Sequence, residues 1–379
     1  MRSRILFALL LVVLAAAGFA LWWTYFRAPE KEALRLHEVS FADLPGWRDS
    51  DPGPALAAFR RSCVKIAALP PAAPMAYAGT AHDWQKACDD AATVRTASRF
   101  FETAFTPFAI DTGDGLVTGY YEPLLNGSAT RHGAYRVPVY GVPEDLVMID
   151  LGLFRPEWKG MRIAGQMEGH YLAPYPDRAA IDAHPPRTAP VLFWSDDPVS
   201  VFFLHIQGSG RVRLDDGRML RVTYAGQNGH PYTPIGRTLI ADGALKREEV
   251  SMQSIRAWLT AHPDEAARVM ESDASFIFFK QEPVGDRTLG PAGSEGVALT
   301  PRASIAVDPT IHPFGAPMFI TGDGLADLFV AQDTGGAIRG PARADIFFGF
   351  GPAAEDTAGK MKAHARFFVL LPNGVRPTP

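Results

Sequence analysis

The chain has 379 residues, of which 47% are hydrophobic and 21% charged, so it can bury a sizeable core and is not intrinsically disordered. Its formal charge of −4 and the lack of a basic run interleaved with aromatic residues argue against nucleic-acid binding and favour a neutral or polar polymer as a large substrate. The 35 Gly and 32 Pro favour many short strands, and the length suggests two domains.

The N-terminal segment has the composition of a membrane anchor. Arg2 and Arg4 precede an apolar stretch over residues 5–26, which ends in aromatic residues and is long enough to span a bilayer. The arginines stay inside, so we expect the body to be exported. The small residues over 15–20 are typical of a signal-peptide cleavage site, which leaves a cleaved, soluble form as the alternative.

Helical patterns follow over residues 55–69, 83–92 and 94–105. They contain the two cysteines of the chain, Cys63 and Cys88. An exported protein can join such a pair in a disulfide, and two buried free thiols are the alternative. The sequence leaves both open.

Strand-like sequence begins at residues 115–123, and the stretch to about residue 223 is dense in Pro, Gly and aromatic residues. We predict a hairpin of strands 200–214 and 218–226, because Asp216-Gly217 between them is a favoured tight-turn pair. Helices are predicted over 248–260 and from Pro263 onwards. Further strands are predicted at 275–280, 303–308, 317–320, 327–333, 344–349 and 366–371.

Two helical regions therefore bracket a β-rich middle. This order predicts a mainly β protein with flanking helices, in which a β domain is inserted into a discontinuous barrel domain and a ligand groove lies between them. We divide the chain into an anchor or signal segment (1–27), a helical part of the barrel domain (28–118), the inserted domain (119–247) and the C-terminal barrel part (248–379).

Two aspartates near the C-terminus are the strongest candidates for chemistry. Asp333 ends one apolar run and Asp345 lies inside the next, where a charge beside aromatic residues is costly unless it is paired. Such a carboxyl either finds a partner or shifts its pKa upward, and a carboxyl protonated near neutral pH is a general acid. The alternative is that both are turn or capping residues.

Other polar residues are candidates for ligand binding. Glu122 follows a tyrosine pair, and Gln207 is predicted to end a strand before Gly208-Ser209-Gly210. Tyr120, Tyr121, Trp194 and Tyr232 could stack on sugars or belong to the core. The sequence contains no metal-ligand spacing, nucleophile elbow or phosphate loop, so we expect neither a metal nor a cofactor.

Six blocks, in order, resemble the membrane-bound lytic transglycosylase A (MltA) family, and the likeness spans about residues 105–370. The segment from Val307 to Gly349 also resembles the 3D domain, whose three aspartates correspond to Asp308, Asp333 and Asp345. The blocks are TGYYEPLL (118–125), HIQGSGRV (205–212), YAGQNGHPYTPIGRTLI (224–240), SMQSIRAWL (251–259), SFIFFK (275–280) and DTGGAIRGPARADIFFG (333–349).

The resemblance implies a double-psi β-barrel with an inserted β domain. It also implies cleavage of the β-1,4 bond between N-acetylmuramic acid and N-acetylglucosamine in peptidoglycan, which leaves 1,6-anhydromuramoyl ends. Asp345 matches the catalytic aspartate and Asp333 its neighbour in the groove. The expected substrate-binding residues are Asp333, Gly335, Gly336, Thr118, Tyr120, Glu122, Gln207 and Ser209.

The resemblance implies peptidoglycan glycan strands as the partner, and cell-wall synthesis or division proteins are further candidates. The family is associated with outer-membrane lipoproteins, but no cysteine follows the apolar segment to accept a lipid. We therefore expect a periplasm-facing body, anchored in the inner membrane by residues 5–26. Two alternatives remain: a hydrolytic endoglycosidase that uses Asp333 and Asp345 as a pair, and a non-catalytic peptidoglycan-binding module.

Overall fold

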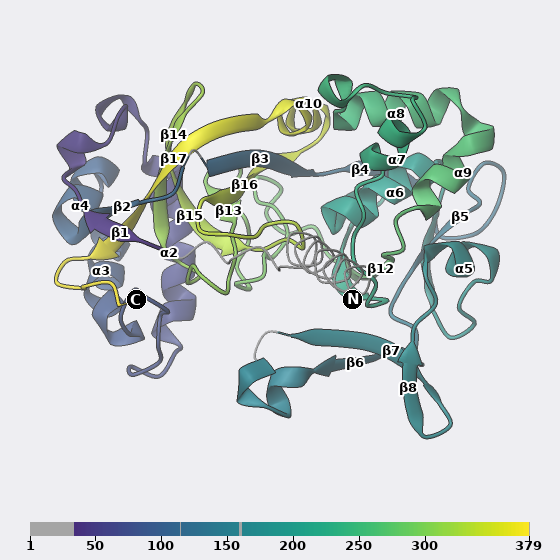
Figure 1. Ribbon diagram of the computed structural model, residues 1–379, viewed down its shortest axis with the longest axis horizontal. Helices are drawn as coiled ribbons and strands as arrows, with labels where there is room; N and C mark the ends of the chain where they lie inside the picture. The colour runs from purple at the N-terminus through teal and green to yellow at the C-terminus, as the bar shows by residue number, and fades with distance from the viewer. Residues whose placement is uncertain (1–33, 114, 159–160, 379) are drawn as a thin grey trace, which may run out of the picture. The chain divides into compact units, whose positions relative to one another are not determined.

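The computed structural model describes residues 34–378 except 114 and 159–160. The predicted anchor over residues 5–26 lies outside the described residues. Within the described part, no helix has the length and apolar character needed to cross a membrane. Strands dominate this part and helices flank them, as predicted (Figure 1).

The larger sheet has eight strands in the order β1-β2-β17-β14-β15-β13-β16-β3. An additional pairing of β3 with β17 closes six of these strands into a ring, which is the predicted barrel. The strands are β1 (Leu36–Glu38), β2 (Phe105–Ile110), β3 (Gly115–Glu122), β13 (Ser304–Ala306), β14 (Pro317–Gly322), β15 (Leu325–Asp333), β16 (Arg343–Phe350) and β17 (Lys362–Pro372).

Three predicted helices pack against this barrel: α2 (Gly53–Ala67), α3 (Ala81–Thr93) and α4 (Ala97–Ala104). Helix α3 begins with a capping box in which Thr80 and Asp83 satisfy each other's backbone amides. The ring of Phe59, which is fully buried, lies 5.5–6.3 Å from four aromatic rings and fixes the three helices around one point. The short 3₁₀ helices η1 (Phe41–Asp43) and η2 (Trp47–Asp49) precede them.

The structure joins Cys63 on α2 to Cys88 on α3 in a disulfide. The sequence left open either a disulfide or two free thiols, and the structure has the disulfide. The bridge closes a loop with a sequence separation of 25 residues. Cross-linking a loop of this length stabilises a fold chiefly by restricting the unfolded chain.

We predict that intact mass after denaturing alkylation shows two modified thiols only when the protein is first reduced. The Cys63→Ala/Cys88→Ala variant should lose about 3 kcal/mol of unfolding free energy, the value expected for a loop of this size. Two alkylated thiols in the unreduced protein would contradict the bridge.

The second sheet has six strands in the order β12-β11-β10-β4-β9-β5. They are β4 (Leu124–Ser128), β5 (Val137–Tyr140), β9 (Val191–Ser195), β10 (Ser209–Leu214), β11 (Met219–Gln227) and β12 (Ile277–Glu282). The chain enters this sheet directly after β3, at Pro123, and leaves it after β12. The domain boundaries given above remain predictions.

The predicted hairpin around Asp216-Gly217 is confirmed as β10–β11, but its first strand is shorter than predicted. Residues 200–207 form most of a helix, α6 (Pro198–Gln207). Asp197 caps this helix through its side chain, Pro198 occupies the first turn, and Gly208 ends it in the left-handed conformation. These start and stop signals outweigh the strand propensity of Val201, Phe202 and Phe203.

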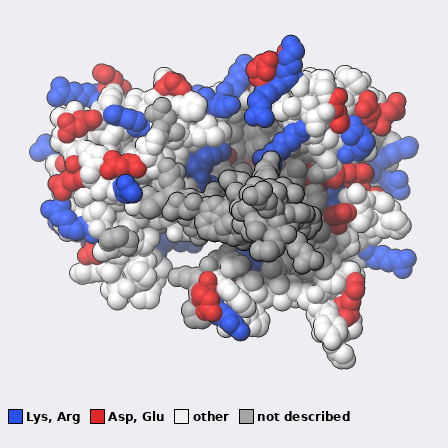
Figure 2. Space-filling model, viewed as in Figure 1, with Lys and Arg blue, Asp and Glu red and all other residues white. Residues whose placement is uncertain are grey.

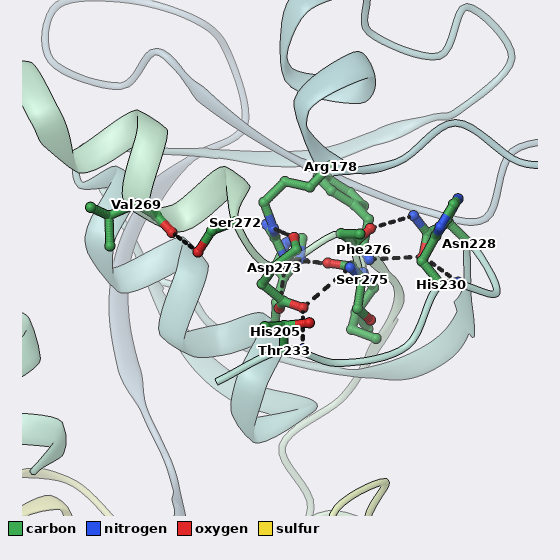
Figure 3. A network of polar contacts seen from close by, with 12 residues as sticks. Arg178, His205, Asn228, His230, Thr233, Val269, Ser272, Asp273, Ser275 and Phe276 are labelled. Carbon is green, nitrogen blue, oxygen red and sulfur yellow. Dashed lines mark hydrogen bonds and ion pairs between the residues drawn. The ribbon is translucent and has the colours of Figure 1, made fainter. Parts of the chain in front are cut away.

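Five further helices lie in the same part of the chain: α5 (Arg178–Ala183), α7 (Gly236–Ala241), η5 (Arg247–Glu249), α8 (Met252–Ala261) and α9 (Pro263–Glu271). A buried polar network, shown in Figure 3, connects α5 and α6 to the segment that leads from α9 into β12. Arg178 Nε donates to the carbonyl of Asp273, whose Oδ1 accepts the backbone N–H of Thr233. His205 lies in the same network, and burial lowers the pKa of its imidazole well below the ordinary value.

A third, three-stranded sheet in the order β6-β7-β8 consists of β6 (Val147–Asp150), β7 (Arg162–Glu168) and β8 (Tyr171–Pro174). The connection between β6 and β7 contains η3 (Leu151–Leu153) and η4 (Pro156–Trp158). Helix α10 (Pro352–Lys360) lies between β16 and β17 in the chain and packs on β3 and β16.

Candidate active site

Strand pairing places the two candidate aspartates on either side of one small residue. Ala306 of β13 pairs with Asp333 of β15 and with Asp345 of β16, and Asp345 also pairs with Thr118 of β3. Directly opposite residues lie on the same face of a sheet. The two carboxyls therefore share one face, and the methyl group of Ala306 leaves the space between them open.

Asp333 is held by four hydrogen bonds. Its Oδ1 accepts from Ser294 N (2.9 Å), Ser294 Oγ (2.8 Å) and Thr334 N (2.9 Å), and its Oδ2 accepts from Tyr120 Oη (2.8 Å). Burial raises the pKa of Asp333, while these hydrogen bonds oppose the rise. The four hydrogen bonds fix the position of the Asp333 carboxyl.

Asp345 has a different environment. Its Oδ1 accepts one hydrogen bond, from Thr118 Oγ1 at 2.7 Å, and within the described residues no hydrogen bond reaches Oδ2. Burial raises the pKa of this carboxyl to about 6, and the nearby charge of Asp333 adds to the rise. The residue as a whole is still partly exposed.

The orientation of the Thr118 hydroxyl follows from its second contact. Arg343 Nη2 donates to Thr118 Oγ1 at 2.9 Å, so the hydroxyl proton is directed to Asp345. Arg343 precedes Asp345 by two residues on β16 and therefore lies on the same face of the strand. Its charge lowers the pKa of Asp345 and partly offsets the effect of burial.

Tyr120 connects the two strands that carry the aspartates. It lies two residues after Thr118 on β3, its hydroxyl reaches Asp333, and its ring packs 5.3 Å from the ring of Phe347 on β16. Burial and the charge of Asp333 raise the pKa of Tyr120 well above its ordinary value, so it remains a hydrogen-bond donor. It bridges the site from β3.

Glu122 was predicted to bind a ligand, but the structure gives it another role. The residue is fully buried, Arg211 Nε donates to its Oε2 at 2.8 Å, and Arg221 donates to both of its oxygens. The two arginines also donate to the carbonyls of Arg287, Leu289 and Gly290. We therefore correct that prediction and assign Glu122 to the support of the loop that leads to Ser294.

The other predicted residues lie on α6, on β10 and in the connection after β15. Gln207 ends helix α6 rather than a strand, and its Oε1 accepts the backbone N–H of Tyr121 at 3.1 Å. Ser209 is buried at the start of β10. Gly335 and Gly336 follow β15, and Gly336 is exposed.

The third aspartate of the 3D pattern shapes the connection between β15 and β16. Asp308 Oδ1 accepts from the backbone N–H and the hydroxyl of Thr310, and its Oδ2 accepts the backbone N–H of Gly340 at 3.0 Å. Gly340 lies in the connection that separates Asp333 from Asp345. Asp308 therefore supports the site from behind and does not face it.

Sequence reasoning missed Ser294 and Arg343. Ser294 lies in an exposed loop 39 residues before Asp333, and no pattern in the chain links the two. Arg343 could have been found from the sequence, because it lies two positions before Asp345 in a predicted strand and alternate residues of a strand share a face. Among the described residues, no group of three or more His, Cys, Asp or Glu side chains is placed to hold a metal ion.

Acidic and basic side chains are interspersed on the face of the molecule in Figure 2. A β-barrel that carries one protonatable and one anchored aspartate is suited to acid–base catalysis. The class that this fold and site define is a β-barrel protein with a candidate acid–base centre.

Comparison with known proteins identifies the family. Models of the MltA specific insert domain and the 3D domain match residues 116–280 and 303–371. Membrane-bound lytic murein transglycosylase A of Escherichia coli K12 is 33% identical over 272 residues, which cover 68% of this chain and 66% of that protein, just under two thirds.

The similarity to solved structures covers a larger share of this chain than the sequence match does. A membrane-bound lytic murein transglycosylase from Agrobacterium tumefaciens is 37% identical, with a TM-score of 0.79 over 89% of this chain and 97% of that one. MltA from Neisseria gonorrhoeae in its monoclinic form is 32% identical, with a TM-score of 0.77 over 92% and 98%. The chain belongs to the MltA family of lytic murein transglycosylases.

We predict that Thr118→Val raises the pKa of Asp345 further above about 6, because the hydroxyl that favours the charged carboxylate is lost. The alkaline limb of the pH–activity profile, measured as muropeptide release from purified sacculi, should move to higher pH. Thr118→Ser keeps the hydroxyl and should leave the limb in place. An unchanged limb in Thr118→Val would show that this hydrogen bond does not tune Asp345.

Proposed function

We propose that this protein is a lytic transglycosylase that cleaves the β-1,4 bond between N-acetylmuramic acid and N-acetylglucosamine in peptidoglycan, with Asp345 as its acid and base. The observation that carries the proposal is the state of Asp345. Its pKa is raised to about 6, one of its oxygens accepts from Thr118, and no hydrogen bond among the described residues reaches the other. A group of this kind can donate a proton near neutral pH and take one back.

One carboxyl suffices for this reaction. Asp345 protonates the glycosidic oxygen as the bond to the anomeric carbon breaks, and N-acetylglucosamine leaves with that proton. The C6 hydroxyl of the muramoyl residue then attacks the same carbon, and Asp345 takes its proton, which closes the 1,6-anhydro ring and restores the acid. The nucleophile belongs to the substrate, so the attack is intramolecular and has a high effective molarity.

Asp333 serves this reaction as a fixed charge. Its four hydrogen bonds hold it in place, and its charge raises the pKa of Asp345. A hydrolytic endoglycosidase would need Asp333 to activate a water or attack the sugar. A carboxylate held by four donors is poorly placed for either task, which favours transglycosylation over hydrolysis. A purely binding module would have no need for the raised pKa of Asp345.

The substrate-binding assignments follow from position. We propose that Tyr120, Gly335, Gly336, Gln207 and Ser209 line the path of the glycan strand around Asp345, together with Thr118. Because the curated relatives are named membrane-bound, we further propose that residues 5–26 hold this body at the inner membrane, facing the periplasm. Cell-wall synthesis or division proteins remain candidate partners.

Asp345→Asn should abolish nearly all release of anhydromuropeptides, by at least the ~10²–10⁴-fold typical of acid–base catalysis. The variant should still bind sacculi. Its melting temperature should equal or exceed that of the unmodified protein at about pH 7.5, because the folded state no longer ionises a carboxyl whose pKa is raised. A folded, sacculus-binding variant with near-normal turnover would refute the role of Asp345.

The sign of the stability effect provides an internal control. The pKa of Asp345 is raised from 3.8 to about 6, so its ionisation destabilises the fold above pH 6 and the cost disappears as the pH falls toward 3.8. The melting difference between Asp345→Asn and the unmodified protein should therefore shrink as the pH is lowered to about 4.

Asp333→Asn should lower turnover by roughly one to three orders of magnitude through lost positioning and electrostatics, with sacculus binding largely retained. Because the charge that raises the pKa of Asp345 is removed, the alkaline limb of the pH–activity profile should move to lower pH. Normal turnover with an unmoved limb would show that Asp333 is only a turn residue.

A further inference from the structure

The three-stranded sheet has one face that is apolar throughout. Val147 lies opposite Gly165 and Ile149 opposite Ile163 in the β6–β7 pair, and β8 places Leu172 opposite Met167. Opposite residues share a face and alternate residues along a strand lie on opposite faces. This register gives one face the residues Val147, Ile149, Ile163, Gly165, Met167, Leu172 and Pro174.

Neither face is fully covered by the body of the molecule. On the opposite face, Ala164 packs against a buried cluster that includes Tyr140 and Phe278, but Met148 is 51% and Tyr171 80% exposed. On the first face, Ile163 is 44% and Met167 55% exposed, although Ile163 also lines a pocket with Gly229 and His230. In the part of the chain that the structure describes, none of the larger apolar residues of the first face belongs to a buried cluster.

The connection between β6 and β7 extends this apolar character. Leu153 is 86% exposed, Phe154 69%, Met161 53% and Trp158 36%, and Arg155 lies over the ring of Trp158 at 4.9 Å. Eight of the sixteen exposed large hydrophobic residues described lie between Met148 and Tyr171. We call the first face together with Leu153, Phe154, Trp158 and Met161 the β6–β8 surface.

A concentration of exposed apolar residues marks an interaction site, and the chemistry of this surface narrows the choice of partner. A glycan strand needs hydrogen-bond donors and acceptors, and the first face offers no polar side chain. Trp and Phe are the residues that favour the membrane–water interface, and Arg beside them can keep its charge among lipid headgroups while its stem contacts apolar groups.

The short connection between the proposed anchor and the described body keeps the body close to a bilayer. The apolar segment over residues 5–26 ends seven residues (27–33) before Leu34, where the described structure begins. Seven extended residues span at most about 25 Å. An anchor so closely joined raises the effective concentration of the bilayer at the body, so a modest apolar surface suffices for docking.

We propose that the β6–β8 surface docks on the phospholipid bilayer and forms a second membrane contact beside the anchor. This inference rests on the proposed anchor, and not on the proposed reaction. Two contacts restrict how the body turns above the membrane, so they set the direction from which a glycan strand reaches Asp345.

The test uses the full chain with one added cysteine, Phe154→Cys, labelled with an environment-sensitive fluorophore. Cys63 and Cys88 are bonded to each other, so within the described residues the added thiol is the one available. The protein is reconstituted into vesicles of phosphatidylethanolamine and phosphatidylglycerol, with and without brominated acyl chains. Lys246→Cys, at a side chain 72% exposed to solvent, is the matched control.

We expect a blue shift and loss of most of the emission to bromolipid quenching at position 154, and neither at position 246. Adding Leu153→Ser and Trp158→Ser to the Phe154→Cys chain should abolish both signals. Muropeptide release from sacculi, measured in detergent on the same proteins, should stay unchanged, which shows that the fold and the reaction are intact.

Two results would overturn the proposal. One is a chain that floats with the vesicles while the probe at position 154 stays unquenched. This result includes the case in which unlabelled Phe154→Cys cross-links two copies of the chain, which would identify a second copy as the partner of the β6–β8 surface. The other is a chain that fails to float with the vesicles at all. Loss of muropeptide release with quenching retained would instead contradict the proposed reaction and leave this surface assignment standing.

Discussion

Burial of one carboxyl, that of Asp345, determines the chemistry that the site can perform. A carboxylate inside a barrel strand is costly, and the fold offers it a single hydrogen bond from Thr118 and the partial compensation of Arg343. The raised pKa is the consequence of that limited support. Asp333 differs in that four hydrogen bonds oppose the rise in pKa that its burial causes.

Keeping Asp345 in this state requires contacts from distant parts of the chain. Thr118 and Tyr120 come from a strand more than 200 residues earlier. The loop that leads to Ser294 is held by Arg211 and Arg221, and both arginines pair with the buried Glu122. Gln332, next to Asp333, donates to a carbonyl of α2 and so joins the barrel strand to the helical layer. The site is therefore a property of the whole fold.

The sequence predicted many of the regular elements, because their signals are local: capping residues for the helices, alternation and Gly or Pro for the strands. It made no separate prediction for β2, α5, α7 or α10. It failed at residues 200–207, where the apolar run suited either structure and the cap at Asp197 decided for a helix. The two aspartates could be chosen because carboxyls among aromatic residues are costly. Glu122 was misjudged because its arginines are 89 and 99 residues away, and Ser294 was missed because only the folded loop brings it to Asp333.

In the proposed reaction Asp345 acts alone and water takes no part in the cleavage. Digestion of purified sacculi in ¹⁸O-enriched water, followed by mass spectrometry of the released muropeptides, tests this directly. We expect muramoyl ends that are lighter than the hydrolysed product by one water and that carry no ¹⁸O. Reducing muramoyl ends labelled with ¹⁸O would contradict it and would identify a hydrolase that uses Asp333 and Asp345 together.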